Sequence, residues 1–307
     1  MDYQSILNDI SNEIKPFLDE GKVADYIPAL ANVDANQFGM SLTLFDGTQY
    51  SVGDSDTLFS IQSISKVFTF TLALKFYSKK LYKRIGVEPS GNPFNSLVQL
   101  EYEHGKPRNP FINAGAINIT DALVNYYKDE DIAYEEVLNF IKSITDNDSI
   151  SSNDIVSSSE MEHGHRNKAL ANLMKSFNNF DNCVDKIVEV YFKHCSIEMN
   201  TRMLSRAMLY LANHGIDPIT AKQHISSSQA KRINAVMLTC GHYDASGDFA
   251  FNVGLPAKSG VGGGIAAVVP KQMGISVWSP GLNAQGNSLV GTMALELFTK
   301  KTGLSIF

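Results

Sequence analysis

The stretch FSIQSISKVF places Ser63 and Lys66 three residues apart, with apolar residues on both sides of the pair. A serine hydroxyl is a poor nucleophile at neutral pH and needs a base within hydrogen-bond reach. Residues i and i+3 of a helix share one face about 5–6 Å apart, so the lysine amine can serve the serine. Burial must then lower the pKa of the amine well below its usual value of about 10.4. The spacing is therefore compatible with a serine nucleophile and a lysine base.

A second interpretation is a serine that caps a helix and a lysine on its surface. The same spacing recurs at Ser228 and Lys231, where the sequence opens a polar amphipathic helix and capping is the better explanation. Ser63 at a first helical turn would in addition aim free backbone N–H groups at a developing oxyanion. The spacing alone leaves both interpretations of Ser63 open.

Penicillin-recognising serine enzymes combine S-x-x-K with a later K-T-G strand. The literal match, 301–303, follows the last predicted helix, and we expect Gly303 to cap that helix. Lys258-Ser259-Gly260 lies on a β-type segment before a glycine-rich run, which lets a substrate approach the backbone. A plain turn between strands explains this segment equally well. The middle motif of those enzymes, Ser-Asp-Asn, is absent.

Hydrophobic periodicity predicts the elements that must position these residues. We expect helices over 5–18, 63–77 and 288–300, with mostly helical sequence from 80 to 240. Asp46-Gly47 predicts a tight hairpin, and Pro28 predicts an irregular loop. Short β-rich pieces separated by Gly and Pro follow residue 248.

Strands grouped apart from helices favour an α+β fold. We predict an antiparallel sheet flanked by helices, built from both chain ends, with an inserted all-helical domain. Residues 1–62 plus 228–307 would form the α/β domain and 63–227 the helical domain, with the active site at their interface.

The composition excludes several classes of function. The 307 residues have a net charge of −6, which argues against nucleic-acid and anionic-membrane binding. No apolar run approaches the roughly 18 residues that span a bilayer. Three widely spaced cysteines, Cys183, Cys195 and Cys240, fit reduced thiols, and the N-terminus lacks the pattern of a secretion signal. We expect a cytoplasmic protein.

Several long motifs occur in one order along nearly the whole chain: KVADYIPALA, QSISKVF, NPFINAGAI, RNKALA, CSIE and YDASGDFAFNVGLPAKSGVGGGI. With them the sequence resembles the serine-dependent glutaminases, which share the β-lactamase/penicillin-binding-protein type of fold. The resemblance implies hydrolysis of the side-chain amide of L-glutamine to L-glutamate and ammonia. It also implies a homodimer or homotetramer.

The resemblance assigns roles to individual residues. Ser63 matches the nucleophile and Lys66 its base, while Tyr26 and Tyr243 match tyrosines of the catalytic site. Either Tyr243, as a proton relay near Ser63, or Lys66 would protonate the departing ammonia. The substrate-binding positions fall on the following residues: Ser63, Asn113, Glu160, Asn167, Tyr191, Tyr243 and Val261. A carboxylate suits the α-ammonium of glutamine and neutral amides suit its other polar groups. The N–H groups of Ser63 and Val261 would form the oxyanion hole.

No cofactor or metal is expected. His163 and His165 form an H-x-H pair without a nearby third ligand, so we interpret them as solvent-exposed. Two rival functions remain: a β-lactamase or peptidase on the same scaffold, and a module that binds glutamine without turnover. The missing Ser-Asp-Asn and the absent export signal argue against the first rival.

Overall fold

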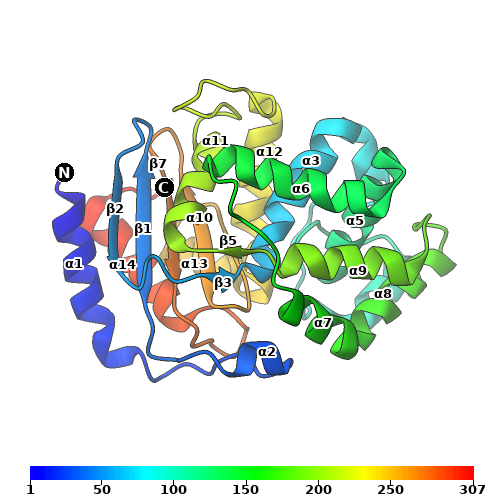
Figure 1. The fold of residues 1–307 in the computed structure, drawn as a ribbon, viewed down its shortest axis with the longest axis horizontal. Coiled ribbons are helices and arrows are strands. Elements are labelled where there is room, and N and C mark those ends of the chain that lie inside the picture. Colours follow the sequence, from blue (N-terminus) through cyan, green and yellow to red (C-terminus); the bar gives the residue numbers. More distant parts are fainter.

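The computed structural model describes all 307 residues, with a five-stranded antiparallel sheet as its central layer (Figure 1). Its strands run in the order β2-β1-β7-β6-β5. Their bounds are β1 Gly39–Leu44, β2 Gln49–Gly53, β5 Ala257–Ser259, β6 Gly264–Val269 and β7 Met273–Trp278. β1 pairs with β7, so the two ends of the chain meet in the middle of the sheet. The predicted antiparallel sheet from both chain ends is confirmed.

The β1–β2 hairpin turns at Asp46-Gly47, as the sequence predicts. Gly47 has φ +88°, a left-handed conformation that glycine adopts without a Cβ clash. The Asp46 carboxylate accepts a hydrogen bond of 2.9 Å from the Thr48 N–H and closes the turn.

Two terminal helices cover one face of the sheet. α1 (Tyr3–Ile14) and α14 (Leu289–Thr302) lie side by side at the far left of Figure 1, in blue and red. A cluster of 20 buried hydrophobic residues fills the space between these helices and the strands. Both helices were predicted, with ends a few residues away, and Gly303 caps α14 at φ +69° as expected.

The other face of the sheet packs against helices from the middle of the chain. They are α3 Ser65–Tyr77, α10 Thr201–Ala207, α11 Leu209–Ala212 and α12 Ser227–Cys240. α10 lies directly on β1, where Thr201 and Ser205 share hydroxyl hydrogen bonds of 2.8 and 2.7 Å with Ser41 and Thr43. A core of 37 buried residues joins this layer to the outer helices.

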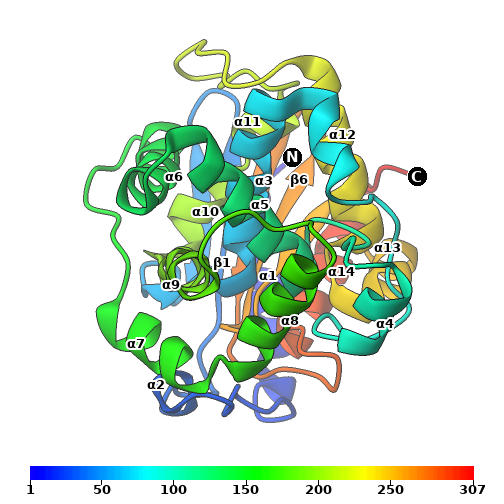
Figure 2. The same ribbon diagram turned by 90° about the vertical axis from the view of Figure 1, so that its right-hand side faces the viewer.

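The outer helices form the right-hand side of Figure 1 and face the viewer in Figure 2. They are α4 Leu97–Tyr102, α5 Asn113–Tyr127, α6 Glu130–Thr145, α7 Asp154–His163, α8 His165–Ser176 and α9 Val184–Cys195. The remaining short elements are η1 Lys15–Phe17, α2 Pro28–Ala31, β3 Phe59–Ser60, η2 Gln62–Ile64, η3 Ser78–Lys83, β4 Glu198–Met199, η4 Tyr243–Ala245 and α13 Ser246–Asn252. The mostly helical centre of the chain is thus confirmed.

Two local predictions were wrong. Pro28 begins the short helix α2 instead of an irregular loop, because the first helical position needs no N–H donor and suits the fixed φ of proline. The cap of α12 is Ser226, which forms a capping box with Gln229, whereas Ser228 is exposed two residues further on.

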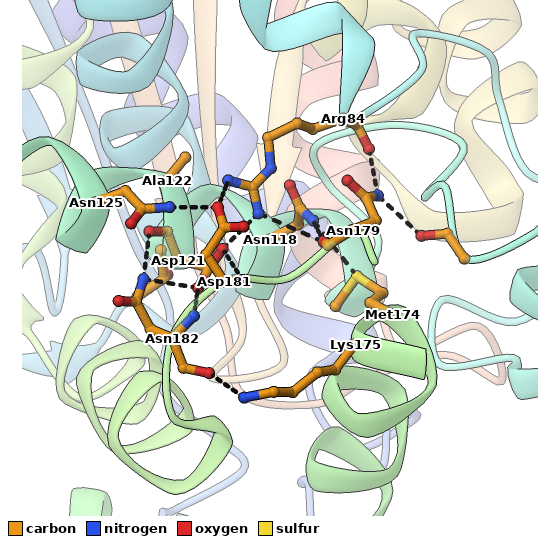
Figure 3. Close-up of polar contacts among 12 residues, drawn as sticks. Arg84, Asn118, Asp121, Ala122, Asn125, Met174, Lys175, Asn179, Asp181 and Asn182 are labelled. Atoms are coloured by element: carbon orange, nitrogen blue, oxygen red, sulfur yellow. Dashed lines mark hydrogen bonds and ion pairs between the residues drawn. The ribbon is translucent and has the colours of Figure 1, made fainter. Parts of the chain in front are cut away.

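A buried polar cluster fixes α5 against the loop between α8 and α9 (Figure 3). Asp121 on α5 pairs with Arg84 and also accepts hydrogen bonds of 3.1 and 2.9 Å from the backbone N–H groups of Asp181 and Asn182. Arg84 pairs with Asp181 as well, at 2.9 Å. Since α5 begins at Asn113, this cluster orients a helix that reaches the candidate site.

Candidate active site

Ser63 lies in the 3-10 turn η2, between the end of β3 and the start of α3. The preceding Gln62 adopts φ +48° to make this turn. The β5–β6 connection approaches closely: a Cβ on Gly260 would lie 2.6 Å from the Ile61 carbonyl oxygen and 3.4 Å from the Ser63 nitrogen. Glycine is therefore required at position 260, and the turn places Val261 beside Ser63.

A cavity of about 390 Å³ opens at Ser63. It brings together seven of the nine residues that the sequence predicts for the site: Tyr26, Ser63, Asn113, Glu160, Asn167, Tyr191 and Val261. Lys66 and Tyr243 do not line the cavity but are buried, with 1% and 6% of their surface exposed.

The Lys66 amine does not form the direct hydrogen bond to Ser63 that the spacing suggested. It donates to the Asn113 side-chain oxygen at 2.7 Å and to the Phe111 carbonyl at 3.2 Å. A buried amine needs fixed acceptors, and these two provide them. Burial lowers the pKa of Lys66 to about 8, although Cys195 and Glu160 act in the opposite direction.

Tyr243 also lies in the left-handed region, at φ +56°. Its buried hydroxyl makes no hydrogen bond of normal geometry. Burial raises the pKa of Tyr243 to about 12, while the nearby hydroxyls of Ser63 and Ser259 and the Val261 N–H lower it in part. The hydroxyl is thus close to Ser63 and has a free lone pair and proton.

Glu160 on α7 is a buried carboxylate, 5% exposed. The Tyr26 hydroxyl donates to its Oε1 at 2.6 Å, although 49% of the surface of Tyr26 is exposed. Burial raises the pKa of Glu160, against the lowering effect of Tyr26, Gln62 and Lys66. Figures 1 and 2 both show α2, which follows Tyr26, against α7. This contact places the tyrosine over the carboxylate.

Three further polar side chains meet at the start of α5. The Asn113 side-chain nitrogen donates to the Asn167 oxygen at 2.9 Å, and the Tyr191 hydroxyl donates to the Asn113 oxygen at 3.4 Å. Burial raises the pKa of Tyr191 well above its usual value, so its hydroxyl stays a donor. Helices α5, α8 and α9 thus each contribute one neutral polar group to the cavity.

Sequence reasoning missed several residues that line the cavity: Gln62, Phe94, Asn95, Gly164, Arg166, Phe192 and Cys195. Phe94 and Asn95 lie in an irregular segment without a periodic signal, held where the Phe94 carbonyl accepts from the Asn113 N–H at 3.0 Å. Arg166 donates to the Asn95 side chain at 3.3 Å. It directly precedes Asn167, which the sequence analysis had already named as a candidate within the RNKALA motif.

The two histidines of the H-x-H pair are both exposed, and His163 also lines the cavity. No group of three or more His, Cys, Asp or Glu side chains is arranged to hold a metal ion. No helix has the length and apolar character that a membrane span requires.

Known proteins match this chain over its full length. A family model described as Glutaminase matches residues 21–307. A glutaminase of Aliarcobacter butzleri strain RM4018 is 62% identical over 307 residues, with 100% of both chains covered. A glutaminase of Rhizobium meliloti strain 1021 is 53% identical over 306 residues, covering 100% of this chain and 97% of that one.

Solved structures match as well. A probable glutaminase from Bacillus subtilis, complexed with 6-diazo-5-oxo-L-norleucine, has a TM-score of 0.91 at 36% identity, covering 100% of this chain and 98% of that chain. The sheet, its helical layers and the enclosed polar cavity define a hydrolase of the β-lactamase-like fold. The chain belongs to the glutaminase family and is an amidohydrolase with glutaminase activity. The predicted resemblance and fold class are thereby confirmed.

Proposed function

We propose that the enzyme hydrolyses the side-chain amide of L-glutamine through a covalent glutamyl ester on Ser63. The observation that carries this proposal is a serine at the cavity wall, one turn before a fully buried lysine whose pKa falls to about 8. An amine of this kind is neutral in a useful fraction of molecules near neutral pH and can accept a proton.

The reaction balances in two steps. In acylation, Ser63 Oγ bonds to the amide carbon, its proton passes through the basic groups to the departing nitrogen, and the C–N bond breaks to release ammonia. In deacylation, water adds to the ester carbon, the C–O bond to Ser63 breaks, and the proton from water returns to Ser63 as glutamate leaves.

The proton path includes Tyr243, because Lys66 does not hydrogen-bond to Ser63 directly. The Tyr243 hydroxyl is buried near Ser63 and lacks a partner of its own. A hydroxyl can donate one proton while it accepts another, which suits it to relay the serine proton toward the leaving nitrogen. Lys66 holds the proton between the two transfers.

The oxyanion of the tetrahedral intermediate would be bound by the backbone N–H groups of Ser63 and Val261. The close approach of Gly260 to Ser63 supports this assignment. Donors that are fixed before the reaction cost no reorganisation, and the loss of one typically lowers the rate by about 10²–10³.

Recognition of glutamine follows from the charges around the cavity. The buried Glu160 carboxylate, held by Tyr26, suits the α-ammonium group. Asn113, Asn167 and Tyr191 provide neutral donors and acceptors for the α-carboxylate and the amide. The ligand in the Bacillus subtilis relative supports glutamine as the substrate, since it has a diazoketone where glutamine has its carboxamide.

Mutation of the two central residues tests the mechanism. Ser63→Ala and Lys66→Met should each reduce ammonia release from glutamine by at least about 10³-fold, because the nucleophile or its base is gone. Ammonia is measured in a coupled assay, and circular dichroism checks that each variant folds.

The second S-x-x-K of the chain provides a matched control. Ser228 and Lys231 have the same spacing on an exposed helix surface, so Ser228→Ala and Lys231→Ala should keep full activity. A folded Ser63→Ala variant that retains more than a few per cent of activity would rule out the covalent mechanism.

The two rival functions predict different results in activity assays. A β-lactamase or peptidase would hydrolyse a chromogenic β-lactam, and a binding module would be labelled once without sustained ammonia production. We expect continuous ammonia release from glutamine and no β-lactam hydrolysis.

The proposal also covers the cellular location of the enzyme and its oligomeric state. The three cysteines are all free, as expected of a cytoplasmic protein. We further propose a homodimer or homotetramer, which light scattering of the purified enzyme would test, and no cofactor.

A further inference from the structure

The proposed oxyanion hole depends on the turn 260–264, which leads from β5 into β6. Four of its five residues are glycines, and Val261 is the exception. Glycine has more backbone freedom than any other residue, so a turn of this composition is not rigid by itself. The Val261 N–H makes no backbone hydrogen bond, which leaves it free for an oxyanion. An oxyanion donor is effective only when it is fixed before the reaction, so contacts from outside must hold this turn.

The turn lies against β3, the strand that leads to Ser63. A Cβ on Gly262 would lie 2.4 Å from the Ser60 carbonyl oxygen. A Cβ on Gly264 would lie 2.6 Å from the Phe59 ring. Only glycines allow this approach. The position of the turn on β3 therefore sets the width of the oxyanion hole.

Trp278, the last residue of β7, contacts both the turn and β3. Its indole N–H donates to the Gly262 carbonyl at 2.9 Å, the only hydrogen bond that this carbonyl accepts. Its ring stacks on the Phe59 ring, with 5.0 Å between the centroids and 3° between the planes. The residue is 1% exposed. One buried side chain thus joins the turn to the strand that precedes Ser63.

The neighbouring strands leave room for the indole. Trp278 pairs with Gly264 on β6 and with Gly39 on β1, so neither directly opposite position carries a side chain. Side chains at such positions lie on the same face of the sheet, about 4.5–5.5 Å apart at Cβ. A bulky ring fits here because both partners are glycines.

Trp278 does not line the cavity, so it does not contact the substrate. It belongs to the core cluster of 37 buried residues, where packing alone would suit any large apolar side chain. Packing does not explain why a polar N–H group is placed there. A buried indole N–H needs a partner, and here the partner is the carbonyl of the residue that follows Val261.

We propose that Trp278 is a positioning residue that holds the turn 260–264, and with it the Val261 N–H, in place beside Ser63. This role rests on the proposed oxyanion hole. Acylation and deacylation both pass through a tetrahedral oxyanion, so Trp278 would affect both steps alike. Both kcat and kcat/KM should then depend on the indole N–H, while KM should not.

Trp278→Phe removes the N–H donor and keeps an aromatic ring beside Phe59. We expect kcat to fall about 10–10²-fold with KM changed by less than about twofold, because a slight displacement of one oxyanion donor has an effect of this size. Ammonia release is measured per folded molecule, with circular dichroism and urea unfolding as the checks.

An isosteric replacement separates the loss of the donor from a change in packing. 3-Benzothienylalanine at position 278 has sulfur in place of the indole N–H and nearly the same shape, and it should show the same loss of kcat. It also carries the test alone if Trp278→Phe does not fold.

Tyr210→Phe is the matched control. Tyr210 is 1% exposed in the same core cluster, and its hydroxyl shares a hydrogen bond of 2.8 Å with Thr71. This variant also loses a buried hydrogen bond, but away from the turn, so it should keep wild-type kcat.

A double-mutant cycle separates positioning of the donor from a general structural effect. Replacement of Val261 by its α-hydroxy acid turns the peptide bond into an ester, which removes the N–H and keeps the side chain. This change alone should lower kcat about 10²–10³-fold. In that background either replacement of Trp278 should lower kcat little further, because the donor that it positions is already gone.

Several outcomes would overturn the inference. Wild-type kcat in the folded Trp278 variants would do so, as would a raised KM at unchanged kcat or an equal loss in Tyr210→Phe. Losses that multiply fully with that of the Val261 ester would show that Trp278 acts elsewhere. Wild-type kcat in the ester enzyme would overturn the oxyanion hole together with the inference. A large effect of the ester without any effect at Trp278 would overturn the inference alone.

Discussion

In the proposed mechanism, the chemistry of the site depends on the titration of Lys66. Its amine is buried, bonds to Asn113 and Phe111, and has a pKa of about 8. The charged form is disfavoured by desolvation, so the proton leaves at a lower pH than in water. Base catalysis by this group requires the neutral amine, which predominates above that pKa.

The pH dependence of kcat/KM follows from this titration. Below about pH 8 the fraction of neutral amine falls tenfold per pH unit, so kcat/KM should rise with pH and level off above about pH 8. Initial rates of ammonia release, measured from about pH 6 to about pH 9 with stability checked at each pH, test the prediction. A maximum on the acid side would show that a protonated Lys66 is the active form.

At the residue scale the sequence predicted the types of side chain but not their contacts. The S-x-x-K spacing made Ser63 and Lys66 candidates, yet Lys66 donates to Asn113, which lies 47 positions away. No periodicity could reveal a contact of that kind, nor the unpartnered Tyr243 hydroxyl. A glutamate is normally expected at the surface, so its residue type did not predict that Glu160 is buried. The burial of Glu160 comes from the packing of the fold.

At the scale of elements, helix and strand positions were largely predictable because apolar spacing and turn residues determine them locally. The hairpin at Asp46-Gly47 and the C-cap at Gly303 are examples. The contacts between elements were not predictable. Arg84, which follows η3, and Asp121 on α5 are paired in Figure 3 and are 37 positions apart.

Removal of Asp121 should therefore destabilise the protein strongly. Asp121→Ala leaves the Arg84 charge without its buried partner, with only the half-exposed Asp181 remaining, and leaves two backbone N–H groups without an acceptor. The expected loss is about 3–5 kcal/mol in the free energy of unfolding, from urea titration. The exposed pair Arg202–Asp56 is the control, and Asp56→Ala should cost at most about 1 kcal/mol. Equal losses in the two variants would show that the buried cluster does not fix α5.

At the scale of the whole molecule, the sheet separates the terminal helices from the side that carries the candidate site. α1 and α14 bury one face, while Ser63 and the cavity belong to the other side, with the middle helices. We retain the division into 1–62 plus 228–307 and 63–227 as a proposal. Under this division, the hydroxyl hydrogen bonds that Thr201 and Ser205 share with Ser41 and Thr43 of β1 would join the two parts.

Stability and activity should be separable across the sheet. Ile10 on α1 is fully buried in the terminal-helix cluster. Ile10→Ala should cost about 2–5 kcal/mol of stability through the cavity it leaves. Since the site lies on the opposite side, kcat per folded molecule should not change. A parallel fall in kcat at a temperature where the variant stays folded would contradict this separation.

The central claim is that a glutamyl group becomes attached to Ser63 during turnover. Mass spectrometry of enzyme quenched in acid during glutamine hydrolysis tests it most directly. The account predicts that the peptide containing Ser63 gains the mass of glutamate less one water, and that Ser63→Ala removes the adduct. Sustained ammonia release with no adduct on that peptide, even when quenching is fast compared with turnover, would contradict it.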